Sequence, residues 1–305
     1  MSLLVVGTVA FDAIETPFGK TDKIVGGAAT YIGLSASKLS DKINLVSVVG
    51  DDFPSEAIDM LKNHKVDTAG LQIKKGEKTF FWSGRYHNNM NSRDTIDTQL
   101  NVLETFDPVV PEQYKDCQIL MLGNLMPIIQ QQVFNQLTKK PELTVLDTMN
   151  FWMDNCMDDL MEALKHVDVL TINDEEARQL SGEYSLVVAA KKIMSFGPKT
   201  LIIKKGEHGA LLFNGDKKFF APAMPLEKVF DPTGAGDTFA GGFVGFLHKT
   251  QDFSFENMKR AVVYGSAMAS FCVEEFGTER IANLSMSEVE ERLQEFVDLS
   301  HFDLA

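Results

Sequence analysis

The feature that most constrains this chain is a regular alternation of short apolar runs with stretches of helical periodicity. Six runs rich in β-branched residues are typical of buried strands, at 3–9, 43–49, 118–123, 143–147, 167–172 and 200–204. Because they show no polar alternation, they indicate a parallel sheet covered on both faces. Helical patterns lie between them, at 27–39, 54–64, 127–138, 155–165 and 185–196. The alternation predicts a three-layer α/β fold, a mostly parallel sheet flanked by helices.

The pattern changes towards the end of the chain. A hairpin is predicted over 210–222, and helices follow at 236–249, 254–273 and 285–298, the last with a capping box from Ser287 to Glu290. The segment 78–100 is aromatic, polar and rich in turn residues. With residues 13–25 it forms either a small strand-built lid over the sheet edge or a surface hairpin. Without a repeat or linker, residues 1–305 are expected to form one domain with this appendage.

Composition and charge exclude several classes of protein. The net charge of −14 argues against a nucleic-acid-binding protein, which needs clustered Lys and Arg. Cys117, Cys156 and Cys272 lie far apart, fit no metal-binding spacing and suit a reducing compartment. The short apolar run at the N-terminus has no basic segment before it, and no stretch reaches the roughly 18 apolar residues of a membrane span. We therefore expect a cytoplasmic protein that binds neither membranes nor nucleic acid.

The stretch DPTGAGDTFAGGF, residues 231–243, is the strongest candidate for a functional site. Gly234 and Gly236 allow close approach of the backbone, and an apolar helical pattern follows at once. The free N–H groups at a helix start can hold a phosphate oxygen or a developing negative charge. Asp237 in this loop either caps the helix or removes a proton beside a bound anion. GAGDTF is no dinucleotide fingerprint, since Phe239 occupies the third glycine position.

With four other blocks, this stretch resembles the signature of the ribokinase-like (PfkB) family of sugar and nucleoside kinases. The other blocks are VGTVAFD ending at Asp12, GGAATYIGLSASKL from Gly26, NDEEARQL at 173–180 and KKGEHGALL at 204–212. They occur in the family's order and cover nearly the whole chain. The resemblance implies a ribokinase-like fold and transfer of the γ-phosphoryl group of ATP to a hydroxyl group, commonly an exocyclic CH2OH.

The resemblance also implies roles for the residues of the loop. Asp237 would be the base that accepts the hydroxyl proton, and Gly234, Ala235 and Gly236 would donate backbone N–H groups to the transferring phosphoryl group. Because this base and loop are intact, an active kinase is expected rather than a binding protein on an inactive scaffold. The expected acceptor is the hydroxymethyl group of a sugar, with a purine or other nucleoside as the alternative.

For the nucleotide side, the resemblance implies contacts to ATP from Asn173, Lys205, Gly206, Gly209 and Thr233. Asn173 and Glu176 would organise Mg2+ and its waters, because Mg2+ keeps most of its water shell and needs only one or two protein groups. Lys204, next to Lys205, could also touch phosphate. Asp231 and Thr233 match positions that often shape a monovalent-cation (K+) site in relatives, although bracing the loop would explain them as well.

For the acceptor side, the resemblance implies a floor made of Asp12, Gly26 and Gly27, with the carboxylate accepting hydrogen bonds from hydroxyl groups. Asp12 follows an apolar strand, and strand ends in open parallel sheets face the ligand crevice. Tyr31 stands where the family usually has asparagine. This departure removes a sugar contact, and the ring could stack on a base or pack under the lid.

The family's lid corresponds to the segment 78–100. Its aromatic residues, Phe80, Phe81, Trp82 and Tyr86, would suit a nucleoside. Arg85 or Arg93 would instead suit an acceptor that already carries a phosphate, and Arg85 is a predicted substrate ligand. Asn150 or Trp152, which follow the strand at 143–147, could also reach the cleft. The hydrophobic face of the lid could serve as a homodimer contact.

Overall fold

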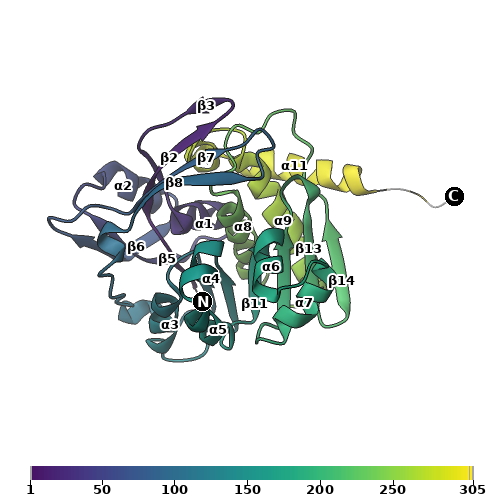
Figure 1. The fold of residues 1–305 in the computed structure, drawn as a ribbon, viewed down its shortest axis with the longest axis horizontal. Helices are drawn as coiled ribbons and strands as arrows, with labels where there is room; N and C mark the ends of the chain where they lie inside the picture. Colours follow the sequence, from purple (N-terminus) through teal and green to yellow (C-terminus); the bar gives the residue numbers. More distant parts are fainter. Residues whose placement is uncertain (1, 302, 304–305) are drawn as a thin grey trace.

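A computed structural model describes residues 2–301 and 303 and contains a nine-stranded sheet (Figure 1). The strand order is β14-β13-β12-β11-β10-β9-β1-β5-β6. The strands from β6 to β12 in this order are parallel, and β13 and β14 are antiparallel. The bounds are β1 (Leu3–Val6), β5 (Ile43–Gly50), β6 (Val66–Lys74), β9 (Ile119–Leu122), β10 (Leu143–Asp147), β11 (Val169–Asn173), β12 (Thr200–Lys204), β13 (Ala210–Asn214) and β14 (Lys217–Ala221).

The side chains of the central strand β1 point alternately to the two faces of this sheet. Leu3 and Val5 pack into a core with α1 (Ala28–Ser37), α2 (Ser55–Asn63), α8 (Ala235–Thr250), α9 (Phe255–Cys272), α10 (Glu279–Asn283) and α11 (Met286–Ser300). Leu4 and Val6 pack into a second core with α3 (Pro127–Asn135), α4 (Asn150–Asn155), α5 (Met157–Leu164), α6 (Asp174–Ser181) and α7 (Leu186–Met194). Helices thus cover both faces, and the predicted three-layer α/β fold is confirmed.

A second sheet is built from the segments predicted to form the lid. Its order is β3 (Gly19–Lys20), β2 (Ala10–Thr16), β7 (Phe81–Tyr86) and β8 (Arg93–Gln99), and β4 (Ile24–Gly26) pairs with β2. Strands β2 and β7 run parallel, and the other pairs are antiparallel. Figure 1 shows this sheet in the upper part of the view, above the main sheet.

Three local predictions differ from the structure. Strand β6 was not predicted, because much of this edge strand is polar and only Val66 and Gly70 are buried. The helix predicted at 155–165 corresponds to α5, and a further short helix that was not predicted, α4, ends just before it at Asn155. The capping box predicted at Ser287 and Glu290 lies two residues earlier. Ser285 Oγ accepts from Glu288 N at 3.3 Å, and Glu288 Oε2 accepts from Ser285 N at 2.9 Å.

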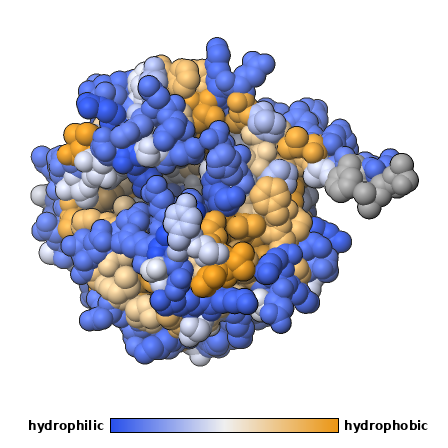
Figure 2. Space-filling model, turned by 45° about the vertical axis from the view of Figure 1, so that its right-hand side comes forward, coloured by the Kyte–Doolittle hydropathy of each residue, from blue (hydrophilic) through white to orange (hydrophobic). Residues whose placement is uncertain are grey.

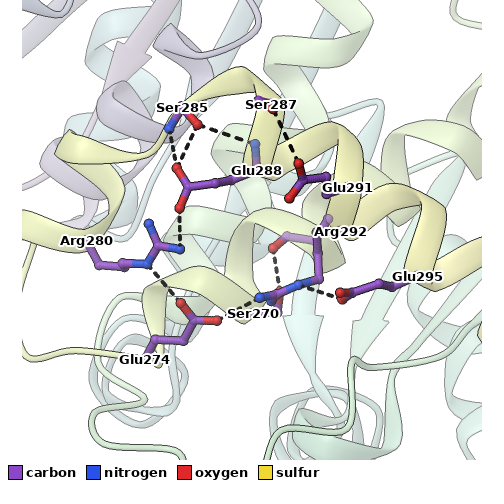
Figure 3. A network of polar contacts seen from close by, with 10 residues as sticks. Ser270, Glu274, Arg280, Ser285, Ser287, Glu288, Glu291, Arg292 and Glu295 are labelled. Carbon is purple, nitrogen blue, oxygen red and sulfur yellow. Dashed lines mark hydrogen bonds and ion pairs between the residues drawn. The ribbon is translucent and has the colours of Figure 1, made fainter.

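A network of charged residues fixes the C-terminal helices to one another (Figure 3). Glu274 accepts hydrogen bonds from Arg280 Nε and Arg292 Nη2, both at 2.8 Å. Arg280 Nη2 also pairs with Glu288 at 3.0 Å. Both guanidinium groups lie over the ring of Phe271, at 4.8 and 4.1 Å from its centroid. The network fixes the segment between α9 and α10, which reaches the candidate site.

The surface seen in Figure 2 is mostly hydrophilic, with hydrophobic residues in separate patches. Exposed large hydrophobic side chains include Tyr184, Phe220 and Ile96. Two short 3-10 helices, η1 (Asn101–Leu103) and η2 (Glu112–Tyr114), connect the second sheet to β9, and η3 (Gly206–His208) follows β12. Among the described residues, no helix combines the length and apolar character needed to cross a membrane.

Candidate active site

Three neighbouring strands of the main sheet end in a polar residue at the same edge. Asp147 is the last residue of β10, Asn173 of β11 and Lys204 of β12, and Asn173 pairs directly with Lys204. The start of α8 lies against them, since a Cβ on Gly236 would be 3.0 Å from Lys204 Nζ. Ligands of open α/β sheets bind at the carboxyl ends of the parallel strands. The loop singled out in the sequence therefore lies where a ligand is expected.

The start of α8 has a conformation that requires glycine at residue 234. Gly234 has a φ of 75°, and a Cβ there would lie 2.5 Å from the ring of Tyr31. Tyr31 is 1% exposed, so its ring packs beneath the loop and the structure does not present it to the cleft. The N–H of Ala235, predicted to hold the phosphoryl group, donates to the Pro232 carbonyl at 3.1 Å. Gly236, the second residue of the helix, has an N–H without an intrahelical acceptor.

Asp237 lies in the first turn of α8 and is not its N-cap. Gly234 is the cap residue, and within residues 2–301 no side chain caps this helix. Burial, followed by the charge of Asp147, raises the pKa of Asp237 to about 7, while Lys204 and Arg93 oppose the shift. A carboxylate with a pKa near the working pH suits a proton acceptor. The structure therefore excludes the cap, which is one of the two roles that the sequence left open for Asp237.

A buried ion pair lies next to Asp237. Lys204 Nζ is 2.7 Å from Asp147 Oδ2, and the two side chains are only 16% and 7% exposed. Burial lowers the pKa of Lys204, but the charges of Asp147 and Glu176 raise it by more than burial lowers it. The pKa of Lys204 therefore lies above its ordinary value. The sequence did not separate Lys204 from Lys205, and it gave no prediction for Asp147. The only signal was that each residue ends a β-branched apolar run.

Asn173 and Glu176 form a reciprocal capping box at the start of α6. Asn173 Oδ1 accepts from Glu176 N at 2.8 Å, and Glu176 Oε2 accepts from Asn173 N at 2.7 Å. Glu176 is 4% exposed, and burial raises its pKa to about 7. In the part of the chain that the structure describes, no three His, Cys, Asp or Glu side chains form a group that could hold a metal ion. The two residues therefore fit Mg2+ only if phosphates and waters supply the remaining ligands.

Asp12 lies on β2 against the glycine pair that the sequence grouped with it. A Cβ on Gly26 would be 1.9 Å from Asp12 Oδ2, and Gly27 has a φ of 91°. Burial, then the charge of Asp231, raises the pKa of Asp12 to about 7, and a hydrogen bond from the Gly27 N–H opposes the shift. Asp237 contributes to the same shift. The structure thus brings the predicted acceptor floor and the predicted base into one electrostatic cluster.

The second sheet contacts the site at two points. Thr233 Oγ1 donates to Tyr86 Oη at 3.3 Å, which joins β7 to the loop before α8. Asn91, in the turn between β7 and β8, donates through Nδ2 to Glu207 Oε1 at 3.2 Å. A Cβ on Gly206 would lie 2.3 Å from Asn91 Oδ1. The sheet therefore extends from the predicted catalytic loop to the predicted nucleotide loop.

Arg85 is not brought to the cleft, contrary to its predicted role as a substrate ligand. Its Nε pairs with Glu15 at 2.8 Å and its side chain is 54% exposed, whereas the neighbouring Tyr86 is buried. Successive side chains of a strand point to opposite faces, so Arg85 lies on the face away from the loop. Arg93 on β8 instead acts on the site, because its charge lowers the pKa of Asp237 and of Glu176.

The remaining predicted residues have structural partners. Lys205 N donates to the Gly209 carbonyl at 2.8 Å, which closes the loop containing η3. Gly209 has a φ of 77°, and a Cβ there would be 2.1 Å from the Ala221 carbonyl oxygen. Asn150 bonds to Gln179 on α6, and Trp152 Nε1 donates to Asn124 Oδ1 at 2.7 Å. These partners account for the two residues that the sequence suggested could reach the cleft.

Asp231 braces the loop. Oδ1 accepts from Thr233 N at 2.8 Å, and Oδ2 accepts from Gly277 N at 3.2 Å. The side chain is 1% exposed, so both oxygens are used inside the protein. The bonds join the loop before α8 to the segment after α9. The sequence left two roles open for Asp231, a monovalent-cation site and bracing of the loop, and the structure shows direct contacts for the second.

Comparisons with known proteins show that the chain is similar to several kinases. A cytidine kinase from Thermococcus kodakarensis is 31% identical over 250 residues, covering 80% of this chain and 87% of the relative. The crystal structure of a nucleoside kinase from Methanocaldococcus jannaschii, an archaeal member of the ribokinase family, matches with a TM-score of 0.76 and 23% identity over 97% of this chain and 99% of that one. A protein from E. coli described as a putative ribokinase II, crystallised with ATP and Mg2+, matches with a TM-score of 0.77 and 20% identity over 96% and 99% of the two chains.

The family model described as pfkB family carbohydrate kinase matches residues 2–283. This range includes both sheets and the residues from Asp12 to Asp237 that form the site. The chain therefore belongs to the pfkB family of carbohydrate kinases and is a phosphotransferase that acts on a hydroxyl group.

Proposed function

We propose that this kinase transfers the γ-phosphoryl group of ATP to the hydroxymethyl group of a nucleoside. The observation that carries the proposal is the position of Asp237, in the first turn of α8 beside the N–H of Gly236, with a pKa raised to about 7. Phosphoryl transfer to an alcohol requires a proton acceptor and a group of N–H donors that holds the phosphoryl charge, and the start of α8 offers both side by side.

In the proposed reaction, Asp237 accepts the proton of the acceptor hydroxyl group. The oxygen of that group forms a bond to the γ-phosphorus, while the bond to the bridging oxygen breaks and leaves its electron pair on ADP. The N–H groups at the start of α8 and the positive end of the helix dipole hold the charge of the transferring group. The positive φ of Gly234 presents this helix start without a side chain in the way.

The charges on the acceptor side support an uncharged acceptor. The floor carries Asp12, and Asp231 and Asp237 add negative charge to it. Two cations of the second sheet and its connections pair with carboxylates, Arg85 with Glu15 and Lys23 with Asp52 at 3.1 Å. Another, Arg93, lies over the ring of Trp82 at 5.7 Å from its centroid, and its charge is opposed by Asp237 and Glu176. A buried carboxylate favours an acceptor with hydroxyl donors and disfavours one that carries a phosphate.

The choice of nucleoside over free sugar rests on similarity. The cytidine kinase of Thermococcus kodakarensis covers most of this chain at 31% identity. A free sugar is the second candidate, because a ribokinase from Bacillus subtilis is 26% identical over 92% of both chains. Tyr31 does not offer the ring that would read a base, because it is buried beneath Gly234. Base recognition is therefore assigned to the aromatic residues of β7.

When bound, Mg2+ would neutralise charge on the ATP phosphates. Asn173 and Glu176 would hold it through waters, with the oxygen of Glu176 that the capping box does not use. The proposal needs no monovalent cation, since Asp231 and Thr233 already brace each other. Lys205, Gly206 and Gly209 are assigned to the nucleotide loop, which follows β12 and contains η3.

The second sheet is assigned as the lid of residues 13–25 and 78–100, in one domain with the main sheet. It is proposed to close over the acceptor through Tyr86 and Asn91. Asn91→Ala should increase proteolysis of the β7–β8 turn. Gln99→Ala should not, because the Gln99 side chain donates to Asp97 of the same strand. Equal cleavage of both variants would contradict a lid.

Every residue of β8 is exposed, so this edge strand is available for the expected homodimer contact. Measuring the oligomeric state in solution tests this contact.

An ADP-release screen with ATP and Mg2+ tests the acceptor. Its panel comprises pyrimidine and purine nucleosides, ribose, hexoses and sugar phosphates. The expected result is turnover of at least one nucleoside at a kcat/KM well above that of any free sugar or sugar phosphate. A free sugar as the best acceptor would replace the nucleoside with the second candidate. No turnover with any acceptor would contradict the proposed function.

A further inference from the structure

The buried lysine of the site has no role in the reaction as proposed so far. Lys204 ends β12 with its side chain 16% exposed, and its Nζ lies 2.7 Å from Asp147 Oδ2. Removing two charges from water carries a penalty that their attraction only partly offsets, so an apolar pair of similar size would stabilise the sheet as well. The presence of a charged pair at this edge of the sheet, where ligands are expected, therefore indicates a functional role for the lysine charge.

The geometry directs this charge towards the start of α8. An ammonium group has three N–H donors, and among the described residues Asp147 accepts one of them. The position of a Cβ on Gly236 would be 3.0 Å from Nζ, so the lysine head group lies against the helix start on which the phosphoryl group is proposed to bind. The absence of a side chain at Gly236 leaves the remaining donors free to reach an anion held there.

We propose that Lys204 is a catalytic residue whose ammonium group contacts the transferring phosphoryl group, and that Asp147 is a positioning residue that orients it. This inference rests on the proposed function. As the acceptor oxygen bonds to phosphorus and the bond to the ADP oxygen breaks, Lys204 keeps its proton and stabilises the negative charge on the phosphoryl oxygens. The proton of the acceptor goes to Asp237.

The positions of the two partners give them different parts. Lys204, at the end of β12, forms an ion pair with Asp147 at the end of β10, which lies two strands away in the sheet. Lys204 Nζ also lies close to Gly236 at the start of α8. Lys204 is thus the member of the pair that reaches the helix start. Asp147 holds the flexible lysine in one place, which reduces the entropy lost when the phosphoryl group arrives.

Three variants separate a catalytic role from a structural one: Lys204→Met, Asp147→Asn and the double variant. Each is measured for kcat, for the KM of ATP and for the free energy of unfolding. Either single change leaves one buried charge without its partner and should destabilise the fold, whereas the double variant removes both charges. Lys199→Met is the matched control, since Lys199 lies just before β12, is 78% exposed and pairs with Asp168 at 3.6 Å.

We expect kcat to fall roughly 10²–10³-fold in Lys204→Met, as when one donor to a developing anion is removed, and to fall less in Asp147→Asn. The double variant should regain stability and remain as slow as Lys204→Met. Recovery of its kcat to within a few-fold of the wild type would overturn the inference, as would an unchanged kcat in Lys204→Met. In both cases the active wild type and Lys199→Met would leave the proposed function standing. A wild type that phosphorylates no acceptor would overturn both.

Discussion

The ring of Tyr31 lies directly beneath Gly234, only 2.5 Å from the place where a Cβ of residue 234 would be. Gly234→Ala should therefore destabilise the protein in two ways, through the φ of 75° and through this clash. Gly215→Ala is the control, because Gly215 has a φ of 56° with nothing within 4 Å of a Cβ. The control should lose roughly 1–2 kcal/mol of unfolding free energy, and Gly234→Ala should lose more and most of its activity. Equal losses in chemical unfolding would show that Tyr31 does not restrict the loop.

Asp12→Asn should weaken binding of the acceptor and leave the KM of ATP unchanged. A hydrogen bond to a charged group contributes about 1.5–3 kcal/mol, so the KM of the acceptor should rise roughly 10–100-fold. Asp41→Asn, in the exposed loop between α1 and β5, is the control and should change neither KM. If the KM of the acceptor stays at the wild-type value in Asp12→Asn, the acceptor floor lies elsewhere.

Glu176→Gln should raise the Mg2+ concentration needed for half-maximal activity by roughly tenfold. The glutamine oxygen can still accept the Asn173 N–H, so the capping box at the start of α6 is kept while the charge is lost. The exposed neighbour supplies the control, Glu175→Gln, which should behave as the wild type. Titrations of activity against Mg2+ that coincide for both variants would remove Glu176 from the metal site.

The pH dependence of kcat/KM should report the raised pKa of Asp237. Because its pKa is about 7, the carboxyl group is protonated and inactive as a base below that value and ionised above it. Activity should therefore fall about tenfold for each pH unit below about 6 and level off above about 8. Asp12 titrates in the same range and can steepen the acid limb. A profile that is flat from pH 5.5 to 8 would contradict the assignment of Asp237.

Much of the fold could be predicted because buried parallel strands are apolar on both faces. The runs at 143–147 and 200–204 coincide with β10 and β12. Strand β6 was not predicted because an edge strand with few buried residues lacks such a run. Glycines located the loop and helix predicted at 231–249, and Gly234 has the left-handed conformation that favours glycine.

The site was harder to predict where the direction of a side chain decides its role. Lys204 and Lys205 are adjacent in sequence, but only the strand end at Lys204 aims its side chain at Asp147. Arg85 and Tyr86 are likewise neighbours, and the pairing of β7 with β2 decides which one faces the loop. Such choices depend on strand register and on partners far away in the chain, which local sequence patterns do not contain.

The turnover of Asp237→Asn tests the central claim most directly. The asparagine keeps the size of the side chain and cannot accept the proton of the hydroxyl group. The account predicts that kcat with the best acceptor falls about 10²–10⁴-fold, while the affinity for ATP measured by calorimetry stays near that of the wild type. Asp252→Asn, an exposed aspartate beyond the other end of α8, is the control and should keep full activity. A kcat of Asp237→Asn equal to that of the wild type would contradict the account.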